Sequence, residues 1–298
     1  MDHALIKALA CEQVADTGEP ISRQSLGDLA RRAQSVLGKS ISRSTVCRIL
    51  AEDVIKPWRY KHWIFPRDPR FLEKAGPILD LYAGLWDGKP LENEDFIISA
   101  DEKTSIQARH RIHLPLPPGP GRFHRVESEY KRCGALQYLA AWDVRRGYVT
   151  GRCEAKTGIE PFGRLIAQIL AQEPYCSAKR LFLIMDNGSS HRGEASRKRL
   201  QKIDSRIIPV HTPVHASWLN QVEIYFSIIQ RKVLTPNDFP DLDSVRLRLA
   251  LYEELSNRHP KPFDWKFDRA QLAALLTRIT IHEKQREGLL SPRQNAAA

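Results

Sequence analysis

The spacing of apolar and polar positions near the start of the chain predicts two short helices. Between Ser25 and Leu37 the apolar residues recur every three or four positions, which is the spacing of one buried helix face. Gly38 follows as a residue that ends helices. Ser42 is a suitable N-cap for a second helix. The apolar stripe of that second helix is formed by Val46, Ile49 and Leu50.

Two short helices joined by a tight turn make a helix-turn-helix. The outer face of the second helix carries polar and basic residues, namely Arg43, Ser44, Thr45 and Arg48. Because such side chains bind phosphates and base edges, we expect residues 1–57 to form a helix-turn-helix DNA-binding domain. The alternative is an ordinary helical hairpin.

In the middle of the chain, short apolar runs alternate with longer amphipathic stretches. The runs predict strands and the stretches predict helices. The predicted strands are 95–101, 135–144, 147–155, 181–187 and 206–211, and the predicted helices are 159–173, 194–203 and 217–234. The order β-β-β-α-β-α-β-α predicts an α/β fold, a mixed sheet flanked by helices.

The remaining segments complete the expected domain organisation. Residues 58–93, rich in proline and aromatic residues, are expected to form a linker that includes a helical stretch over 72–86. We expect the α/β domain to extend over 94–282, with helical structure from 241 interrupted by the loop 258–267. Residues 283–298 are expected to be a flexible tail.

Charge and composition narrow the class of partner. The 298 residues include 46 Lys and Arg against 35 Asp and Glu, a net charge of +11. A surplus of this size favours a nucleic-acid partner, although a merely basic soluble enzyme is the alternative. No apolar run approaches the length of a membrane span, and we expect no signal peptide, so the expected location is cytoplasmic. Five scattered cysteines without a C-x-x-C pair indicate reduced thiols.

Three acids occupy positions that secondary structure would hold rigidly. Asp101 follows the apolar run 96–100, Asp186 follows the run 181–185, and Glu223 lies on the predicted helix 217–234. If the two strands are neighbours, their carboxyl ends bring the aspartates together, and a helix packed at that edge can add the glutamate. Clustered carboxylates repel one another unless cations neutralise them, which calls for Mg²⁺ or Mn²⁺. Two such ions can carry out phosphodiester chemistry.

Each of these residues also has a plainer interpretation. Asp101 is a possible strand-end turn residue, with its neighbour Glu102 as the actual ligand, and Glu223 is a possible solvated helix residue. His191, close to Asp186 in sequence, is a candidate for assisting proton transfer or gripping a phosphate, and a structural role is the alternative. The dinucleotide-binding G-x-G-x-x-G and the hydrolase G-x-S-x-G are both missing from the sequence.

Three segments together resemble the signature blocks of mariner-like bacterial insertion-sequence transposases. They are SADEKTSIQAR (99–109), IMDNGSSH (184–191) and HASWLNQVEIYFSIIQRKVL (215–234). The third, which places Asn220 and Glu223 ahead of an aromatic-rich helix, is the most specific. Members of this family usually have a further helix-turn-helix, for which the residues before Ser25 are too few. That family belongs to the DDE superfamily of endonucleases, with a ribonuclease-H-like fold.

The resemblance implies that Asp101, Asp186 and Glu223 are the catalytic metal ligands for two Mg²⁺ or Mn²⁺ ions, with Asn220 as an auxiliary residue. It implies a transposase that cleaves transposon ends and joins them to target DNA, acting on double-stranded DNA as a homodimer or larger assembly. A bacterial, nucleoid-associated location is implied as well. The alternatives are a transposase-derived DNA-binding regulator without catalysis and another ribonuclease-H-like nuclease.

Overall fold

The computed structural model describes residues 2–60, 62, 64–186 and 193–294. The chain forms two compact units, Met1–Ile64 and Phe65–Ala298, and each is described by itself below. None of the described helices is both long and apolar enough to span a membrane.

The N-terminal unit is a cluster of helices that pack on one another. They are α1 (Asp2–Cys11), the 3-10 turn η1 (Val14–Thr17), α2 (Leu26–Leu37) and α3 (Arg43–Glu52). Ser25 caps α2 in a reciprocal capping box with Asp28, and Gly38 ends that helix in the left-handed conformation (φ 64°). The Ser42 hydroxyl accepts a hydrogen bond from the Thr45 backbone N–H at 3.1 Å and so caps α3. Both predicted helices are therefore confirmed.

The interior of this unit is apolar, and the outer face of α3 is polar. Leu29, Val46 and Leu50 are buried where α1, α2 and α3 meet. Arg43, Ser44 and Arg48 are exposed, and Thr45 is half-buried.

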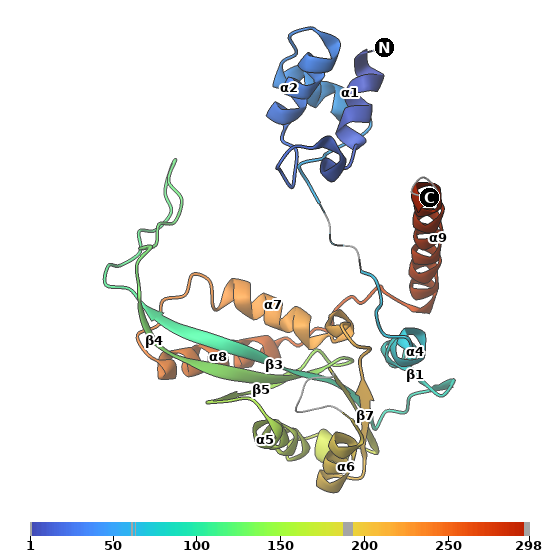
Figure 1. The fold of residues 1–298 in the computed structure, drawn as a ribbon. Coiled ribbons are helices and arrows are strands. Elements are labelled where there is room, and N and C mark those ends of the chain that lie inside the picture. The colour runs from blue at the N-terminus through green and yellow to red at the C-terminus, as the bar shows by residue number, and fades with distance from the viewer. Residues whose placement is uncertain (1, 61, 63, 187–192, 295–298) are drawn as a thin grey trace. The chain divides into compact units, whose positions relative to one another are not determined.

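The larger unit is built on a five-stranded mixed sheet (Figure 1). Its strands are β3 (Asp95–His110), β4 (Lys131–Asp143), β5 (Val149–Glu154), β6 (Arg180–Met185) and β7 (Ile207–His211). They lie in the order β5-β4-β3-β6-β7, with β4 antiparallel to β3 and β5, and with β6 parallel to β3 and β7. Because β3 lies in the centre, the apolar run that ends at Asp101 is covered on both faces.

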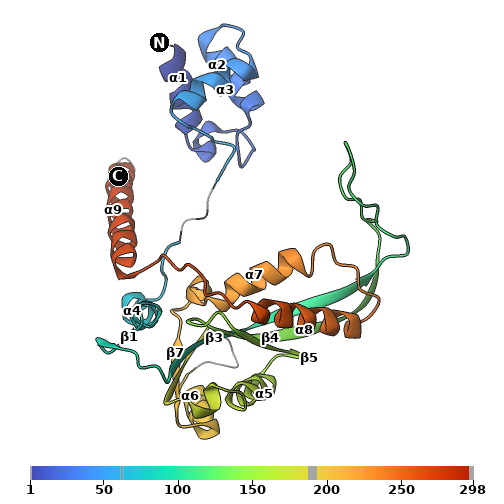
Figure 2. The same ribbon diagram turned by 180° about the vertical axis from the view of Figure 1, so that it is seen from behind.

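Helices cover both faces of this sheet (Figure 2). On one face lie α5 (Ile159–Leu170) and α6 (Gly193–Ile203), where Leu165 and Ile169 pack on Ile98. On the other lie α7 (Val222–Lys232) and α8 (Leu242–Arg258), where Val222 and Tyr225 pack in the core with Ile97. This confirms the predicted β-β-β-α-β-α-β-α order and the α/β fold class.

A third apolar cluster joins segments from both ends of the larger unit. It contains Phe71 and Leu79 from α4 (Phe71–Tyr82), Leu219 from the 3-10 turn η3 (Ser217–Leu219), and Leu272 from α9 (Arg269–Gln294). The expected linker therefore contains a helix that packs within this unit. Helix α9 continues through the expected flexible tail as far as Gln294.

The helix predicted over 72–86 is too long, because its last residues form a strand. The two-residue strand β1 (Leu85–Trp86) pairs with β2 (Lys89–Pro90) in a small antiparallel hairpin. Gly84 and Gly88 both have positive φ angles, near 79° and 74°, which end the helix and turn the hairpin.

Strand β3 also differs from the prediction, because it does not end at Asp101. It continues to His110, and beyond Ser99 it pairs only with β4. From Ile106 on, β3 and β4 form a two-stranded ribbon with mixed exposure, because β5 pairs with β4 only over 137–142 (Figure 1). The register shifts between Lys103 and Ile106, and Ser105 in this bulge has a φ of 57°. The bulge breaks the alternation of apolar and polar residues that would have marked the strand in the sequence.

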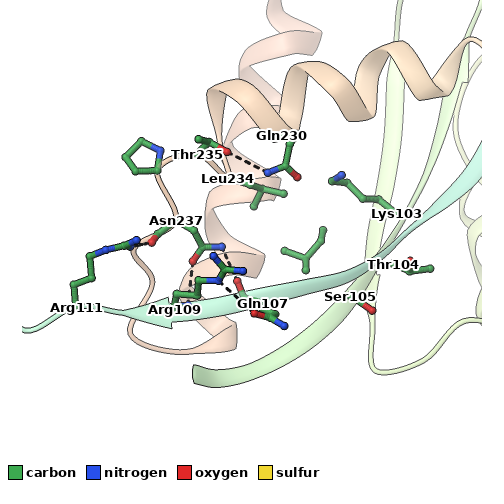
Figure 3. A pocket seen from close by; sticks show the side chains of 12 residues that line it. Lys103, Thr104, Ser105, Gln107, Arg109, Arg111, Gln230, Leu234, Thr235 and Asn237 are labelled. Carbon is green, nitrogen blue, oxygen red and sulfur yellow. Dashed lines mark hydrogen bonds between the residues drawn. The ribbon is translucent and has the colours of Figure 1, made fainter. Parts of the chain in front are cut away.

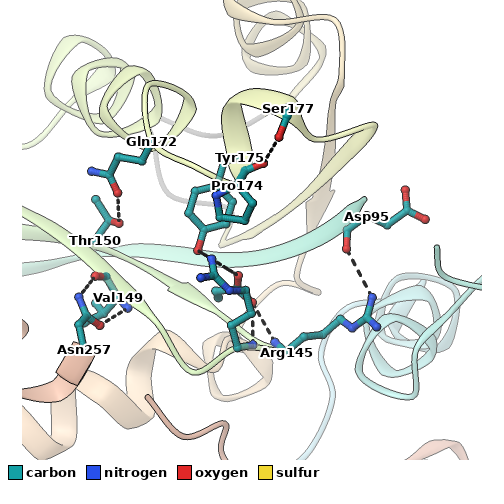
Figure 4. Close-up of polar contacts among 11 residues, drawn as sticks. Asp95, Arg145, Val149, Thr150, Gln172, Pro174, Tyr175, Ser177 and Asn257 are labelled. Atoms are coloured by element: carbon teal, nitrogen blue, oxygen red, sulfur yellow. Dashed lines mark hydrogen bonds and ion pairs between the residues drawn. The ribbon is translucent and has the colours of Figure 1, made fainter. Parts of the chain in front are cut away.

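Buried polar contacts hold the turn between β4 and β5 at the edge of the sheet (Figure 4). Asp143 accepts hydrogen bonds from the backbone N–H groups of Arg145 and Arg146 at 3.0 and 2.9 Å, and from the Tyr175 hydroxyl at 3.0 Å. Asn257 on α8 bonds both the N–H and the carbonyl of Val149, at 2.9 and 2.7 Å. These contacts hold the edge strand β5 and the turn before it in place.

Candidate active site

The parallel pairing of β3 with β6 brings two of the predicted acids side by side. Ser99 on β3 lies opposite Ile184 on β6. Two residues further along each strand, the same offset sets Asp101 beside Asp186, the residue that follows β6. Neighbouring strands are about 4.8 Å apart, so these carboxylates lie within direct electrostatic reach. The buried strand β6 therefore places Asp186, the residue after its last, next to Asp101.

The third acid reaches the same edge on α7. Glu223 lies in the first turn of this helix. The start of the helix is anchored to β3 because the Val222 backbone N–H donates to the Ser99 hydroxyl at 2.8 Å. The structure thus places Asp101, Asp186 and Glu223 near enough to one another for their charges to interact.

Asn220 links these elements through its side chain. It is fully buried, with 0% of its surface exposed. Its Nδ2 donates to the Ala100 carbonyl at 3.1 Å and to Asp101 Oδ2 at 3.2 Å, and its Oδ1 accepts a hydrogen bond from the Ser99 hydroxyl. The Asn220 amide therefore fixes the orientation of the Asp101 carboxylate.

This contact requires a break in the helix that the sequence predicted over 217–234. Asn220 has extended backbone angles (φ −86°, ψ 108°) and separates η3 from α7. The prediction of one continuous helix is wrong at this residue. A continuous helix would give up the hydrogen bonds that the Asn220 side chain makes to β3.

Burial and mutual repulsion change the protonation of this cluster. Burial, together with the charges of Asp186 and Glu223, raises the pKa of Asp101 to about 7, although a hydrogen bond from the Glu102 backbone N–H opposes the shift. Burial also raises the pKa of Glu223, as does Asp186, while Lys103 opposes the shift. Carboxylates held in this state bind a cation readily, because a cation relieves both the burial penalty and the repulsion.

The donor set suits a hard divalent ion. Mg²⁺ takes oxygen ligands and is usually held by one or two carboxylates, with waters and substrate phosphates completing its shell. Among the described residues, no group of three His, Cys, Asp or Glu side chains is placed to hold an ion by itself. Coordination through one or two of the three acids needs no such group, so the residues present fit Mg²⁺ or Mn²⁺.

Two further residues complete the account of the site. His191 lies outside the described residues, as does the segment 187–192 around it. Lys103 was missed by the sequence reasoning, although it follows Asp101 by two positions and therefore belongs to the same strand face. It lines a small pocket together with Glu223. Strand periodicity could have identified it, had the sequence shown that β3 continues past Asp101.

The strand order and the cluster of acids at the edge of the sheet define a ribonuclease-H-like nuclease. The model of the DDE superfamily endonucleases matches residues 97–246, half of the chain. No curated protein matches the sequence. The chain belongs to the DDE superfamily of endonucleases, which confirms the predicted superfamily and the prediction of an enzyme.

Solved structures support the same fold. The crystal structure of the Mos1 mariner paired-end complex with Mn matches with a TM-score of 0.54 at 16% identity, over 84% of this chain and 70% of that one. The corresponding complex with Mg matches with a TM-score of 0.52 at 13% identity, over 87% and 72%. The Mos1 transposase complex with the left transposon end gives 0.51 at 16% identity, over 85% and 70%. The predicted ribonuclease-H-like fold is thereby confirmed.

Proposed function

We propose that this protein is a DNA transposase that cleaves transposon ends and joins them to target DNA. The observation that carries the proposal is the meeting of Asp101, Asp186 and Glu223 where β3, β6 and α7 converge. The family match supports endonuclease chemistry. Among the structures of similar fold, one holds a transposon end and others contain Mn or Mg.

In this proposal the three acids hold two Mg²⁺ or Mn²⁺ ions. When bound, such ions activate a water or a 3′-hydroxyl and stabilise the departing oxygen. The chain itself supplies alignment: Asn220 orients Asp101, and the hydrogen bond from Val222 to Ser99 fixes the start of α7 and hence Glu223. The central strands supply rigidity, because β3 and β6 are buried on both faces.

The N-terminal unit is proposed to bind the transposon end as a helix-turn-helix. Its α3 presents Arg43, Ser44 and Arg48 to solvent, with Thr45 beside them. Residues 1–57 would then recognise DNA, and the domain over 94–282 would cut it. We expect a dimer or larger assembly on paired DNA ends, working in the cytoplasm at the nucleoid.

The test replaces each acid by its neutral isostere. Asp101→Asn, Asp186→Asn and Glu223→Gln should each abolish Mg²⁺-dependent cleavage of a duplex made from the DNA that flanks the gene. Folding and most DNA binding should be retained, because shape and hydrogen-bonding groups are largely preserved.

Glu102→Gln is the matched control, because adjacent strand residues point to opposite faces. It should cut like the parent protein. If Glu102→Gln loses cleavage and Asp101→Asn cleaves normally, the metal ligand is Glu102 and not Asp101. Normal cleavage in all four variants would refute the proposed metal site.

A further inference from the structure

A basic groove runs away from the acid cluster between β3 and α7. It consists of two adjoining pockets, of about 450 and 330 Å³, that share Lys103 and Gln230; Figure 3 shows the larger one. The smaller pocket reaches Glu223, and the larger extends along β3 to Arg109 and Arg111. The groove therefore begins at the proposed catalytic site and leads outward along the ribbon.

The α7 wall of the groove is one helix face. Glu223, Ser227, Gln230 and Arg231 line it, at the i, i+4, i+7 and i+8 positions that share a side of a helix. The segment that follows α7 closes the far end, where the Asn237 side chain bonds the backbone of Gln107 at 2.7 Å and of Arg109 at 3.0 Å. The walls are thus tied to each other by hydrogen bonds.

Positive charge in the groove is not balanced by the residues that line it. Four cations take part, Lys103, Arg109, Arg111 and Arg231, and Glu223 is the only acid among the described lining residues. The Arg109 guanidinium lies 4.6 Å from the centre of the Tyr130 ring and donates to Gln107 Oε1 at 3.3 Å. Within the described part of the chain, no ion pair joins Arg109 or Lys103 to a carboxylate, although the charge of Glu223 acts on Lys103.

The two arginines at the far end of the groove differ in the partners that their guanidinium groups already have. Arg111 donates to the backbone carbonyls of Glu127 and Asn237, so its role is partly structural. Arg109 is held by an aromatic ring and a neutral amide, which position a guanidinium without neutralising it. A fixed, uncompensated guanidinium of this kind is suited to an anionic ligand, above all a phosphate.

We infer that the groove binds the phosphodiester backbone of the DNA next to the bond that is cut. This inference rests on the proposed function and adds the path of the substrate. From Asp101 to Arg109 the strand advances about 26 Å at ~3.3 Å per residue. Phosphates along one strand of duplex DNA advance ~3.4 Å each, so the groove spans roughly eight nucleotides.

The experiment measures binding of the full chain to the duplex from the DNA that flanks the gene, with metal removed so that nothing is cut. Arg109→Gln is compared with Arg258→Gln, which removes an equally positive, exposed side chain from α8. The salt slope is the decrease of log K for DNA binding with log[salt], and each phosphate that the protein no longer neutralises lowers it by about 0.9. The ratio of the parent affinity to the Arg109→Gln affinity should therefore fall about 3-fold between 50 and 200 mM salt. Arg258→Gln should leave the slope unchanged, and Arg109→Lys should restore most of it.

A second arm locates the contact on the DNA. A set of duplexes, each with one neutral methylphosphonate, should weaken binding of the parent protein at a few adjacent positions. In Arg109→Gln the penalty at one of these positions should disappear, because the variant no longer binds that phosphate. Unchanged penalties at every position, together with an unchanged slope, would overturn the groove assignment. Polyglutamate could also displace the DNA from the parent protein but not from Arg109→Gln, while no methylphosphonate has an effect. This result would assign the groove to acidic protein segments and would overturn the proposal that it binds DNA.

The outcomes separate the groove from the proposed function. If the parent protein cleaves and joins DNA while Arg109→Gln behaves like Arg258→Gln, the groove inference fails and the transposase proposal stands. If the methylphosphonate coupling is found but the parent protein never cleaves, the groove stands and the catalytic proposal fails.

Discussion

Asn220→Ala should damage both stability and cleavage, because this side chain connects β3 to α7. The substitution removes the hydrogen bonds to the Ala100 carbonyl and Asp101 Oδ2 and the one received from Ser99. All of these groups are buried, so water cannot replace the missing partner freely. At about 1 kcal/mol for each bond, the expected loss is about 3 kcal/mol in the free energy of unfolding.

Calorimetry on the metal-free protein measures this loss. For a unit of this size, 1 kcal/mol shifts the melting temperature by roughly 2–4 °C, so the larger unit should melt roughly 6–12 °C lower. Cleavage should also fall, because Asp101 is no longer oriented. Removing a residue that orients a metal ligand typically costs about 10- to 100-fold in activity or metal affinity.

Gln221→Met is the matched control for this experiment. Gln221 is the neighbouring amide and is just as buried, but within the described structure its Oε1 has no hydrogen-bond partner. A substitution of similar volume there should cost less than about 1.5 kcal/mol and leave cleavage largely intact. Equal losses in Asn220→Ala and Gln221→Met would refute the reasoning, since the effect would then come from disturbed packing alone.

Two further predictions concern other parts of the chain. Replacing both Arg43 and Arg48 by Ala should weaken DNA binding and lower the salt slope by about 0.9 for each phosphate that is no longer bound; unchanged binding would exclude α3 from the interface. Burial raises the pKa of Glu253 on α8 to about 7. The folded chain then keeps a proton that the unfolded chain releases above pH 4.5, so stability falls as pH rises from there to 7. In Glu253→Gln, the decrease in the free energy of unfolding between pH 4.5 and 7 should be smaller than in the parent protein by at most about 3 kcal/mol. Urea unfolding across this pH range measures it. If the stability of the variant and of the parent protein changes with pH in the same way, Glu253 is not the source of the decrease.

The sequence by itself determined those features that depend on local chemistry. The N-caps at Ser25 and Ser42 bond to backbone groups three residues away, and so they can be recognised from adjacent residues. The apolar runs that precede Asp101 and Asp186 are short and unbroken, as strands buried on both faces require. Because an acid follows each run, the assumption that the two strands are neighbours was sufficient to predict that Asp101 and Asp186 lie close together.

Only the tertiary structure decided features that depend on partners far away in the chain. Asn220 leaves the helix because its side chain bonds Ser99, which lies 121 residues earlier, and no local pattern encodes that choice. The extension of β3 beyond Asp101 relies on pairing with β4 around a bulge, which disrupts the apolar alternation. Lys103 and Arg109 line a basic groove only because α7 packs beside that extension of β3. Local periodicity specifies which face of an element is buried, whereas long-range pairing decides what that face meets.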